Sequence, residues 1–85
     1  MSKYEKLLLQ ILRGTSDANI AFDDLRWLLQ HLDFEERIRG SHHMFRRKGV
    51  EEKINLQSEG NKAKPYQVRQ VRSIIVKYRL GEDEE

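Results

Sequence analysis

The sequence predicts a small α+β protein in which two helices precede a three-stranded antiparallel sheet and a third helix follows it. Apolar residues recur at helical spacing up to residue 32 and again after Pro65, whereas polar and apolar residues alternate from Phe34 onward. The length of 85 residues allows one domain. Three strands form a stable unit when helices cover one face, so we expect the other face of the sheet to be open to solvent.

Two helices are expected in the first part of the chain. Ser2 and Glu5 have the spacing of a capping box, in which each side chain accepts a hydrogen bond from the other residue's backbone. An apolar stripe over residues 4–12 follows, and Gly14 is expected to end this helix. The second apolar stripe predicts a helix over Phe22 to Leu32.

The middle of the chain predicts three strands. The first is expected over Phe34 to Arg39 and the second over His42 to Arg47, with Gly40-Ser41 as the turn between them. After a turn at Lys48-Gly49, the third strand is expected over Glu51 to Gln57.

The last part predicts a loop and one helix. Residues 58–64 contain Gly60 and several polar side chains and are expected to form the loop. Pro65 suits the first position of a helix, and an apolar stripe follows it. Gly81 is expected to end this helix.

Strand alternation predicts which side chains meet solvent. If Phe45 faces the helices, His43 shares its side and His42 lies on the open face. That open face then carries mostly basic and polar residues: Arg37, Arg39, His42, Met44, Arg46, Lys53, Asn55 and Gln57.

The charge is distributed unevenly, although the net charge is only +2. Residues 1–33 carry four basic and five acidic side chains, whereas residues 34–80 carry twelve basic and five acidic ones, a balance of +7. Residues 81–85 form an acidic tail with a charge of −4. A basic excess of this size suggests a phosphate-bearing partner, and a solvated surface that is simply basic is the alternative.

Several classes of function are excluded by what the chain lacks. It has no cysteine, and therefore no disulfide and no thiolate metal site. It has no apolar run near the roughly 20 residues that cross a bilayer and no secretory leader, so we expect a cytoplasmic protein without membrane attachment. His42 and His43 are adjacent and point to opposite faces of a strand, so we predict no metal site. A domain of this size has one thin core and cannot hold a large cofactor-binding sheet, so we predict no small-molecule cofactor.

A histidine beside several arginines is one arrangement that can cleave RNA. The ribose 2′-OH needs a base to become a nucleophile, and His42 is suited to this proton transfer near neutral pH. Arginine or lysine can hold the phosphate and stabilise its developing charge. Two alternatives stay open at this point: a non-catalytic RNA-binding module, and an interaction protein whose basic sheet docks an acidic partner.

Two features of the second half of the chain occur together: the segment Arg39-Gly40-Ser41-His42-His43-Met44-Phe45 and, about twenty residues later, Lys64-Pro65 followed by the amphipathic helix Val68 to Tyr78. In these features residues 34–80 resemble the HicA family of bacterial toxins. With the helix over Phe22 to Leu32 included, the resemblance covers about residues 21–80. The helix within residues 1–20 is then an N-terminal extension, and residues 81–85 are an acidic tail.

The resemblance implies a ribosome-independent endonuclease that cleaves mRNA, the toxin of a type II toxin–antitoxin system. It implies a double-stranded-RNA-binding-like α-β-β-β-α fold, here with an additional N-terminal helix. The family's catalytic histidine is the first after Gly-Ser, which is His42. Independently of the resemblance, a single histidine cannot easily serve as base and acid at once, so we expect a helper group, and His43 is the nearby candidate. A HicB-like antitoxin is the implied partner and masks His42. The candidates to hold the RNA backbone are Arg39, Arg46, Arg47, Lys62 and Lys64.

Overall fold

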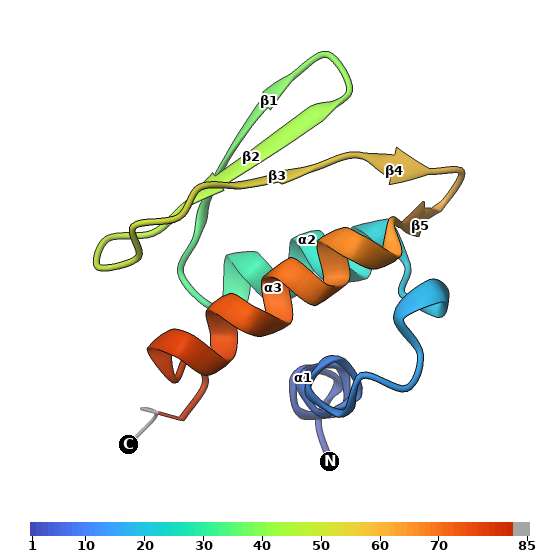
Figure 1. The fold of residues 1–85 in the computed structure, drawn as a ribbon, viewed down its shortest axis with the longest axis vertical. Coiled ribbons are helices and arrows are strands. Elements are labelled where there is room, and N and C mark those ends of the chain that lie inside the picture. The colour runs from blue at the N-terminus through green and yellow to red at the C-terminus, as the bar shows by residue number, and fades with distance from the viewer. Residues whose placement is uncertain (83–85) are drawn as a thin grey trace.

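The helices and strands occur in the predicted α+β order in the computed structural model, which describes residues 1–82 (Figure 1). Residues 83–85 of the predicted acidic tail lie outside the described residues. In chain order the elements are α1 (Lys3–Arg13), the short 3₁₀ helix η1 (Asp17–Asn19), α2 (Phe22–His31), β1 (Glu35–Arg39), β2 (His42–Arg46), β3 (Ile54–Leu56), β4 (Ser58–Glu59), β5 (Lys62–Ala63) and α3 (Pro65–Tyr78).

The predicted capping box of α1 is present. The Ser2 hydroxyl accepts a hydrogen bond from the Glu5 backbone N–H at 3.1 Å, and the Glu5 carboxylate accepts one from the Ser2 N–H at 3.1 Å. Gly14 follows the helix in the left-handed conformation, at φ 71°. Glycine adopts this conformation without the strain a Cβ would cause, which is why α1 ends there.

The sheet has the strand order β1-β2-β3, with both pairs antiparallel. Its register pairs Arg39 with His42 and Ile38 with His43 across the first hairpin, and Phe45 with Ile54 across the second pair of strands. Residues paired in this way share one face of the sheet. The register therefore confirms that His42 and His43 lie on opposite faces.

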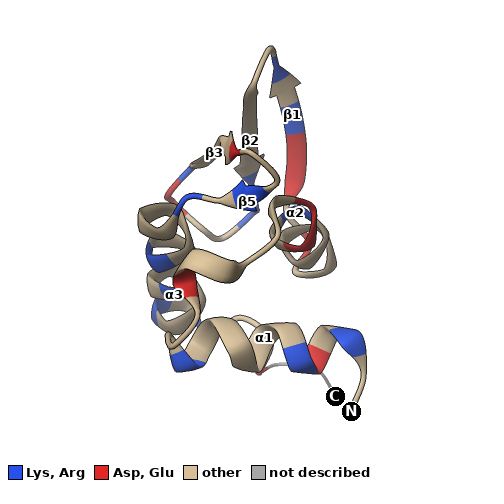
Figure 2. Ribbon diagram, turned by 90° about the vertical axis from the view of Figure 1, so that its right-hand side faces the viewer, with Lys and Arg blue, Asp and Glu red and all other residues tan. Residues whose placement is uncertain are grey.

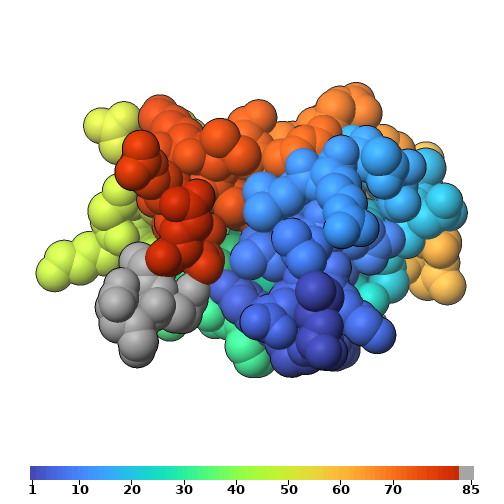
Figure 3. All heavy atoms as spheres, turned by 90° about the horizontal axis from the view of Figure 1, so that it is seen from below, coloured from blue at the N-terminus to red at the C-terminus, as the bar shows by residue number. Residues whose placement is uncertain are grey.

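The molecule is layered, with the sheet on one side of α2 and α3 and α1 on the other (Figure 1). In the view from below, the blue N-terminal segment that includes α1 lies in front (Figure 3). Phe45 and Ile54 are fully buried beneath the sheet, and α1 adds Leu7 and Ile11 to the core from the opposite side. The tip of the β1–β2 hairpin extends beyond the helices (Figure 1), which leaves the Ile38 side chain 52% exposed although it lies on the helix side.

The third strand is shorter than predicted, because it begins at Ile54 and not at Glu51. The carboxylate of Glu52 binds α3 instead of following the sheet: it accepts hydrogen bonds from Lys77 Nζ at 2.8 Å and from the Tyr78 hydroxyl at 2.7 Å. These two bonds hold the pKa of Glu52 at about 2, below its ordinary value of 4.5.

The loop predicted over residues 58–64 contains a small hairpin, β4–β5, with Gly60 in its turn at φ 62°. The Ala63 N–H donates to the Ile20 carbonyl at 2.8 Å, and the Phe22 N–H donates to the Asn61 carbonyl at 3.0 Å. The hairpin thus fixes the start of α2. Its two-residue strands are too short for side-chain alternation to reveal them in the sequence.

The last helix ends earlier than predicted, at Tyr78, and Arg79 already adopts the left-handed conformation at φ 53°. Gly81, two residues later, is also left-handed at φ 82° and turns the chain toward α1. Within residues 1–82, no helix combines the length and the apolar character needed to cross a membrane.

A substitution at Gly81 tests how closely this residue packs against α1. A Cβ at this position would lie 2.9 Å from Leu8 Cδ2 and 3.2 Å from the Tyr4 hydroxyl, in a backbone conformation that already disfavours side chains. We expect Gly81→Ala to lower the free energy of unfolding by about 2–3 kcal/mol, measured by denaturant titration. Gly60→Ala is the matched control: its Cβ meets open space at a similar φ, so only the strain of about 1 kcal/mol remains. Equal losses would show that α1 does not pack closely at Gly81.

Candidate nucleic-acid interface

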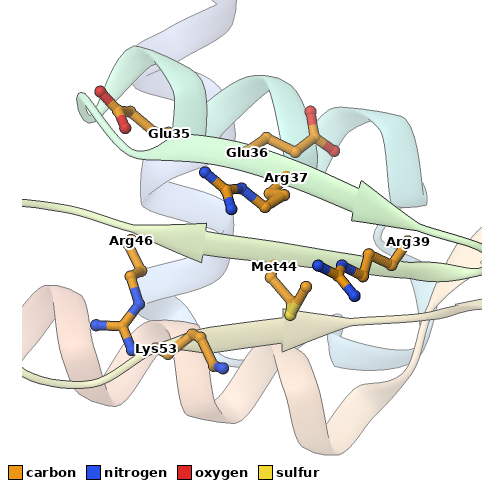
Figure 4. Close-up of a pocket in the computed structure, with 7 residues that line it drawn as sticks. All are labelled: Glu35, Glu36, Arg37, Arg39, Met44, Arg46 and Lys53. Atoms are coloured by element: carbon orange, nitrogen blue, oxygen red, sulfur yellow. The ribbon is translucent and has the colours of Figure 1, made fainter.

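The open face of the sheet gathers cations around one methionine. Arg37 and Arg39 extend from β1, Arg46 from β2 and Lys53 from the segment before β3, and Met44 lies between them (Figure 4). Together with Glu35 and Glu36 these residues line an open depression of about 610 Å³. Helices cover only the opposite face, so this surface is accessible to a large ligand (Figure 1).

The three arginines and Lys53 of this depression take part in no ion pair among residues 1–82. Two carboxylates line the depression, and that of Glu36 is directed to α2 and binds Arg26. Glu35 is therefore the carboxylate of the lining that remains near the cations. Figure 2 shows that β1 is acidic where it begins and basic toward the hairpin turn. Arg46 and Lys53 lie toward the end of the open face where β1 begins, and Arg37 and Arg39 lie toward the turn end.

His42 lies at that end of the open face and is exposed to solvent. It is directly opposite Arg39 in the register, so the two Cβ atoms are about 4.5–5.5 Å apart on the same face. Its Nδ1 lies 3.4 Å from the side-chain oxygen of Asn55 on β3. The predicted pair of a histidine and an arginine is therefore brought together by adjacent strands.

His43 faces α2, as alternation predicts. Its Nδ1 forms a hydrogen bond of 2.7 Å with a carboxylate oxygen of Glu36, and its ring meets the ring of Phe22 edge-on at a centroid distance of 5.0 Å. Its side chain is 15% exposed. Since its ring is on the far side of the sheet from His42, His43 is not placed to complete a two-histidine site with it.

Glu36 is the centre of the polar contacts beneath the sheet. Besides His43 it binds Arg26 from α2 through two hydrogen bonds, of 2.7 and 3.2 Å, and accepts one of 2.8 Å from Gln30. Burial by itself raises the pKa of Glu36, but the hydrogen bonds from Arg26, His43 and Gln30 outweigh burial and hold this pKa below its ordinary value. The carboxylate therefore stays charged and ties β1 and β2 to α2.

The other predicted RNA-binding residues are divided by the structure. Arg46 lies on the open face, whereas Arg47 follows the end of β2 and is half-buried. Lys62 lies on β5 and Lys64 immediately precedes α3, both outside the three-stranded sheet. No hydrogen bond or ion pair among residues 1–82 joins these two lysines to His42.

Three residues of the site are not among the functional residues that the sequence predicts. Strand alternation predicts that Arg37 and Lys53 lie on the open face, and this is the signal that identifies them as phosphate-binding candidates. Alternation predicts the same face for Asn55, but the closeness of Asn55 to His42 depends on the β2–β3 register, which the sequence pattern does not fix. In that register Asn55 pairs with Met44.

The remaining histidine has a different environment. His31 stacks on Trp27 at a centroid distance of 4.1 Å, away from the sheet at the end of α2. In the described part of the chain, no three His, Asp or Glu side chains lie together in a way that would hold a metal ion.

No family model, curated protein or solved structure that was compared with this chain matches it. The HicA resemblance therefore stays a prediction.

Proposed function

We propose that this protein is a metal-independent endoribonuclease that binds RNA on the open face of its sheet and uses His42 for proton transfer. One observation carries the proposal: Arg37, Arg39, Arg46 and Lys53 share an accessible face, unpaired within the described residues, and His42 lies beside Arg39 at the end of that face. Neutralised phosphates release counterions, so such a surface favours a polyanion.

The reaction needs only groups that this arrangement and RNA supply. His42 takes the proton of a ribose 2′-OH, and the 2′-oxygen attacks the adjacent phosphorus. The bond from phosphorus to the 5′-oxygen breaks, and that oxygen takes a proton from the imidazolium or from water. The products are a 2′,3′-cyclic phosphate and a 5′-hydroxyl. Arg39, which is opposite His42 in the register, stabilises the charge that develops on the phosphate oxygens in this proposal.

The wider biological role is part of the same proposal. The order α2-β1-β2-β3-α3 supports a double-stranded-RNA-binding-like core, with β4–β5 inserted before the last helix. As a toxin that cleaves mRNA, the protein would be held inactive by a HicB-like antitoxin that presents carboxylates to the open face and covers His42. This inhibition requires no refolding of the toxin.

RNA binding is expected to depend on the cations of the open face. We expect the double variant Arg39→Ala, Arg46→Ala to weaken binding to unrelated RNA sequences alike, and to reduce the slope of log affinity against log salt by about 1 per lost phosphate contact. Fluorescence anisotropy over a salt series measures both quantities. Arg46→Ala alone should have a larger effect than Arg47→Ala, because Arg47 is half-buried beyond the strand.

Lys6→Ala is the control for this experiment, because Lys6 is an exposed cation on α1, on the other side of the helical layer. It should leave the affinity and the slope near those of the wild type. If Lys6→Ala and the double variant weaken binding equally, RNA contacts the protein through its overall charge and not through the open face.

A further inference from the structure

We propose that Asn55 is a positioning residue for His42: it holds the proton on Nδ1 and so makes Nε2 the nitrogen that accepts a proton from RNA. The inference rests on the proposed function for its catalytic part, but the tautomer it assigns is a property of the protein alone. It concerns one contact, between His42 Nδ1 and Asn55 Oδ1 at 3.4 Å.

The chemistry of the two atoms fixes the direction of this hydrogen bond. An amide oxygen accepts and does not donate, so the imidazole nitrogen facing it must carry the hydrogen. A neutral imidazole has only one N–H, and its other nitrogen, Nε2, then holds the free electron pair. Asn55 therefore selects which end of the ring acts as the base.

The position of Asn55 explains why the contact is formed. Asn55 pairs with Met44 in the β2–β3 register, so it lies on the open face, on the strand next to His42. In the described residues no hydrogen bond gives this amide another partner. Nδ1 is engaged at β3, and Nε2 is left for a ligand on the face that also presents Arg39.

A second link holds the hairpin tip against β3. Gln57 donates a hydrogen bond from its side chain to the Ser41 hydroxyl at 3.1 Å, and its backbone N–H donates to the side chain of Gln67 at 3.1 Å. Gln67 belongs to α3 and is only 4% exposed. Polar contacts thus connect the buried face of α3 to the residue that precedes His42, which fixes the turn relative to Asn55.

The tautomer is tested by long-range ¹H–¹⁵N NMR of histidine-labelled protein, above the pH at which His42 loses its imidazolium proton. We expect the wild type to carry the proton on Nδ1 of His42, and Asn55→Leu to shift it toward the mixture found in a solvated imidazole. His31 serves as the internal control and should not change. A wild-type His42 protonated on Nε2 would overturn the assignment, whatever the protein does to RNA.

The catalytic part is tested with the same variants in an RNA cleavage assay. Asn55→Leu should lower kcat about 10-fold with little change in KM. This is at the lower end of the loss that follows when the orienting partner of a functional histidine is removed. In Asn55→Asp the added negative charge favours the imidazolium, so the acidic limb of the pH–rate profile should move to higher pH. Unchanged kcat and an unchanged profile in both variants would overturn the positioning role.

Failure of the role proposed for Asn55 and failure of the proposed RNA cleavage give different results. A wild type with the proton on Nδ1 that leaves RNA intact would contradict the proposed cleavage while confirming the tautomer. An active wild type with the proton on Nε2 would contradict the role of Asn55 while leaving the proposed cleavage in place.

Discussion

His42→Ala is expected to lower the rate of RNA cleavage by about 10²–10⁴-fold, the usual contribution of a positioned acid–base group. The fold should be unaffected, because His42 is exposed and outside the core. We expect the free energy of unfolding of His42→Ala to stay within about 0.5 kcal/mol of that of the wild type, which corresponds to a shift of at most about 2–4 °C in melting temperature. RNA affinity should survive, since the arginines of the open face remain.

His43→Ala is the matched comparison, because it changes the same residue type one position along the strand. It removes the hydrogen bond to Glu36 and the edge-on contact with Phe22, so we expect a loss of about 1–2 kcal/mol in stability with cleavage retained. Activity assays and thermal melts of both variants decide the assignment. If His43→Ala is inactive and stable while His42→Ala is active, the proton transfer belongs to the His43–Glu36 pair beneath the sheet.

Glu36→Ala is expected to have the largest effect on stability among the polar residues of the site. It leaves Arg26, which is 27% exposed, without its main partner, and it also removes the hydrogen bonds of Gln30 and His43. We expect the free energy of unfolding to fall by about 2–3 kcal/mol, less than for a fully buried pair because Arg26 is still partly hydrated. Asp23→Ala is the control. Asp23 binds the same arginine, but its side chain is 86% exposed. Asp23→Ala should therefore lower the free energy of unfolding by at most about 0.5 kcal/mol.

The pH dependence of stability follows from the lowered pKa of Glu36. Since this pKa is lower in the folded protein than in the unfolded chain, the carboxylate contributes stability that is complete above its ordinary value of 4.5 and is lost as the pH falls through the folded value. As the pH is lowered from 6 into the acidic range, the free energy of unfolding of Glu36→Gln should therefore fall less than that of the wild type. Urea titrations at several pH values measure both. Glu52 and Asp17, whose pKa values are also lowered, keep their own acid dependence in this variant. Parallel curves for Glu36→Gln and the wild type would contradict the role assigned to Glu36.

Much of the fold was predictable because local signals agree with tertiary packing. The capping box at Ser2, the glycine after α1 and the proline that begins α3 are short-range signals, and each is present in the structure. Strand alternation was also sufficient to separate His42 from His43, since a one-residue step changes the face. The structure confirms an α+β fold with antiparallel sheets, whereas the assignment to the HicA family stays a prediction.

The rest depends on contacts between distant residues. Nothing near Glu52 indicates that it binds Tyr78 of α3, and Glu52 lies before the start of β3, within the range predicted as strand. The β4–β5 hairpin is stabilised by backbone bonds to the start of α2, which have no side-chain pattern. The partnerships of Glu36 with His43 and of Asn55 with His42 likewise depend on how α2 and β3 meet the hairpin. Polar partners across elements are the part of the site that the sequence leaves open.

Incubation of the purified protein with end-labelled RNA in EDTA shows whether this face cleaves RNA through His42. We expect cleavage that leaves 2′,3′-cyclic phosphate and 5′-hydroxyl ends and that is absent in His42→Ala prepared in the same way. RNA that is retained by the wild type but stays intact would identify a non-catalytic RNA-binding module. RNA that is neither cleaved nor retained would identify a surface for an acidic protein partner. Either result, or equal cleavage by wild type and His42→Ala, would contradict the proposed function.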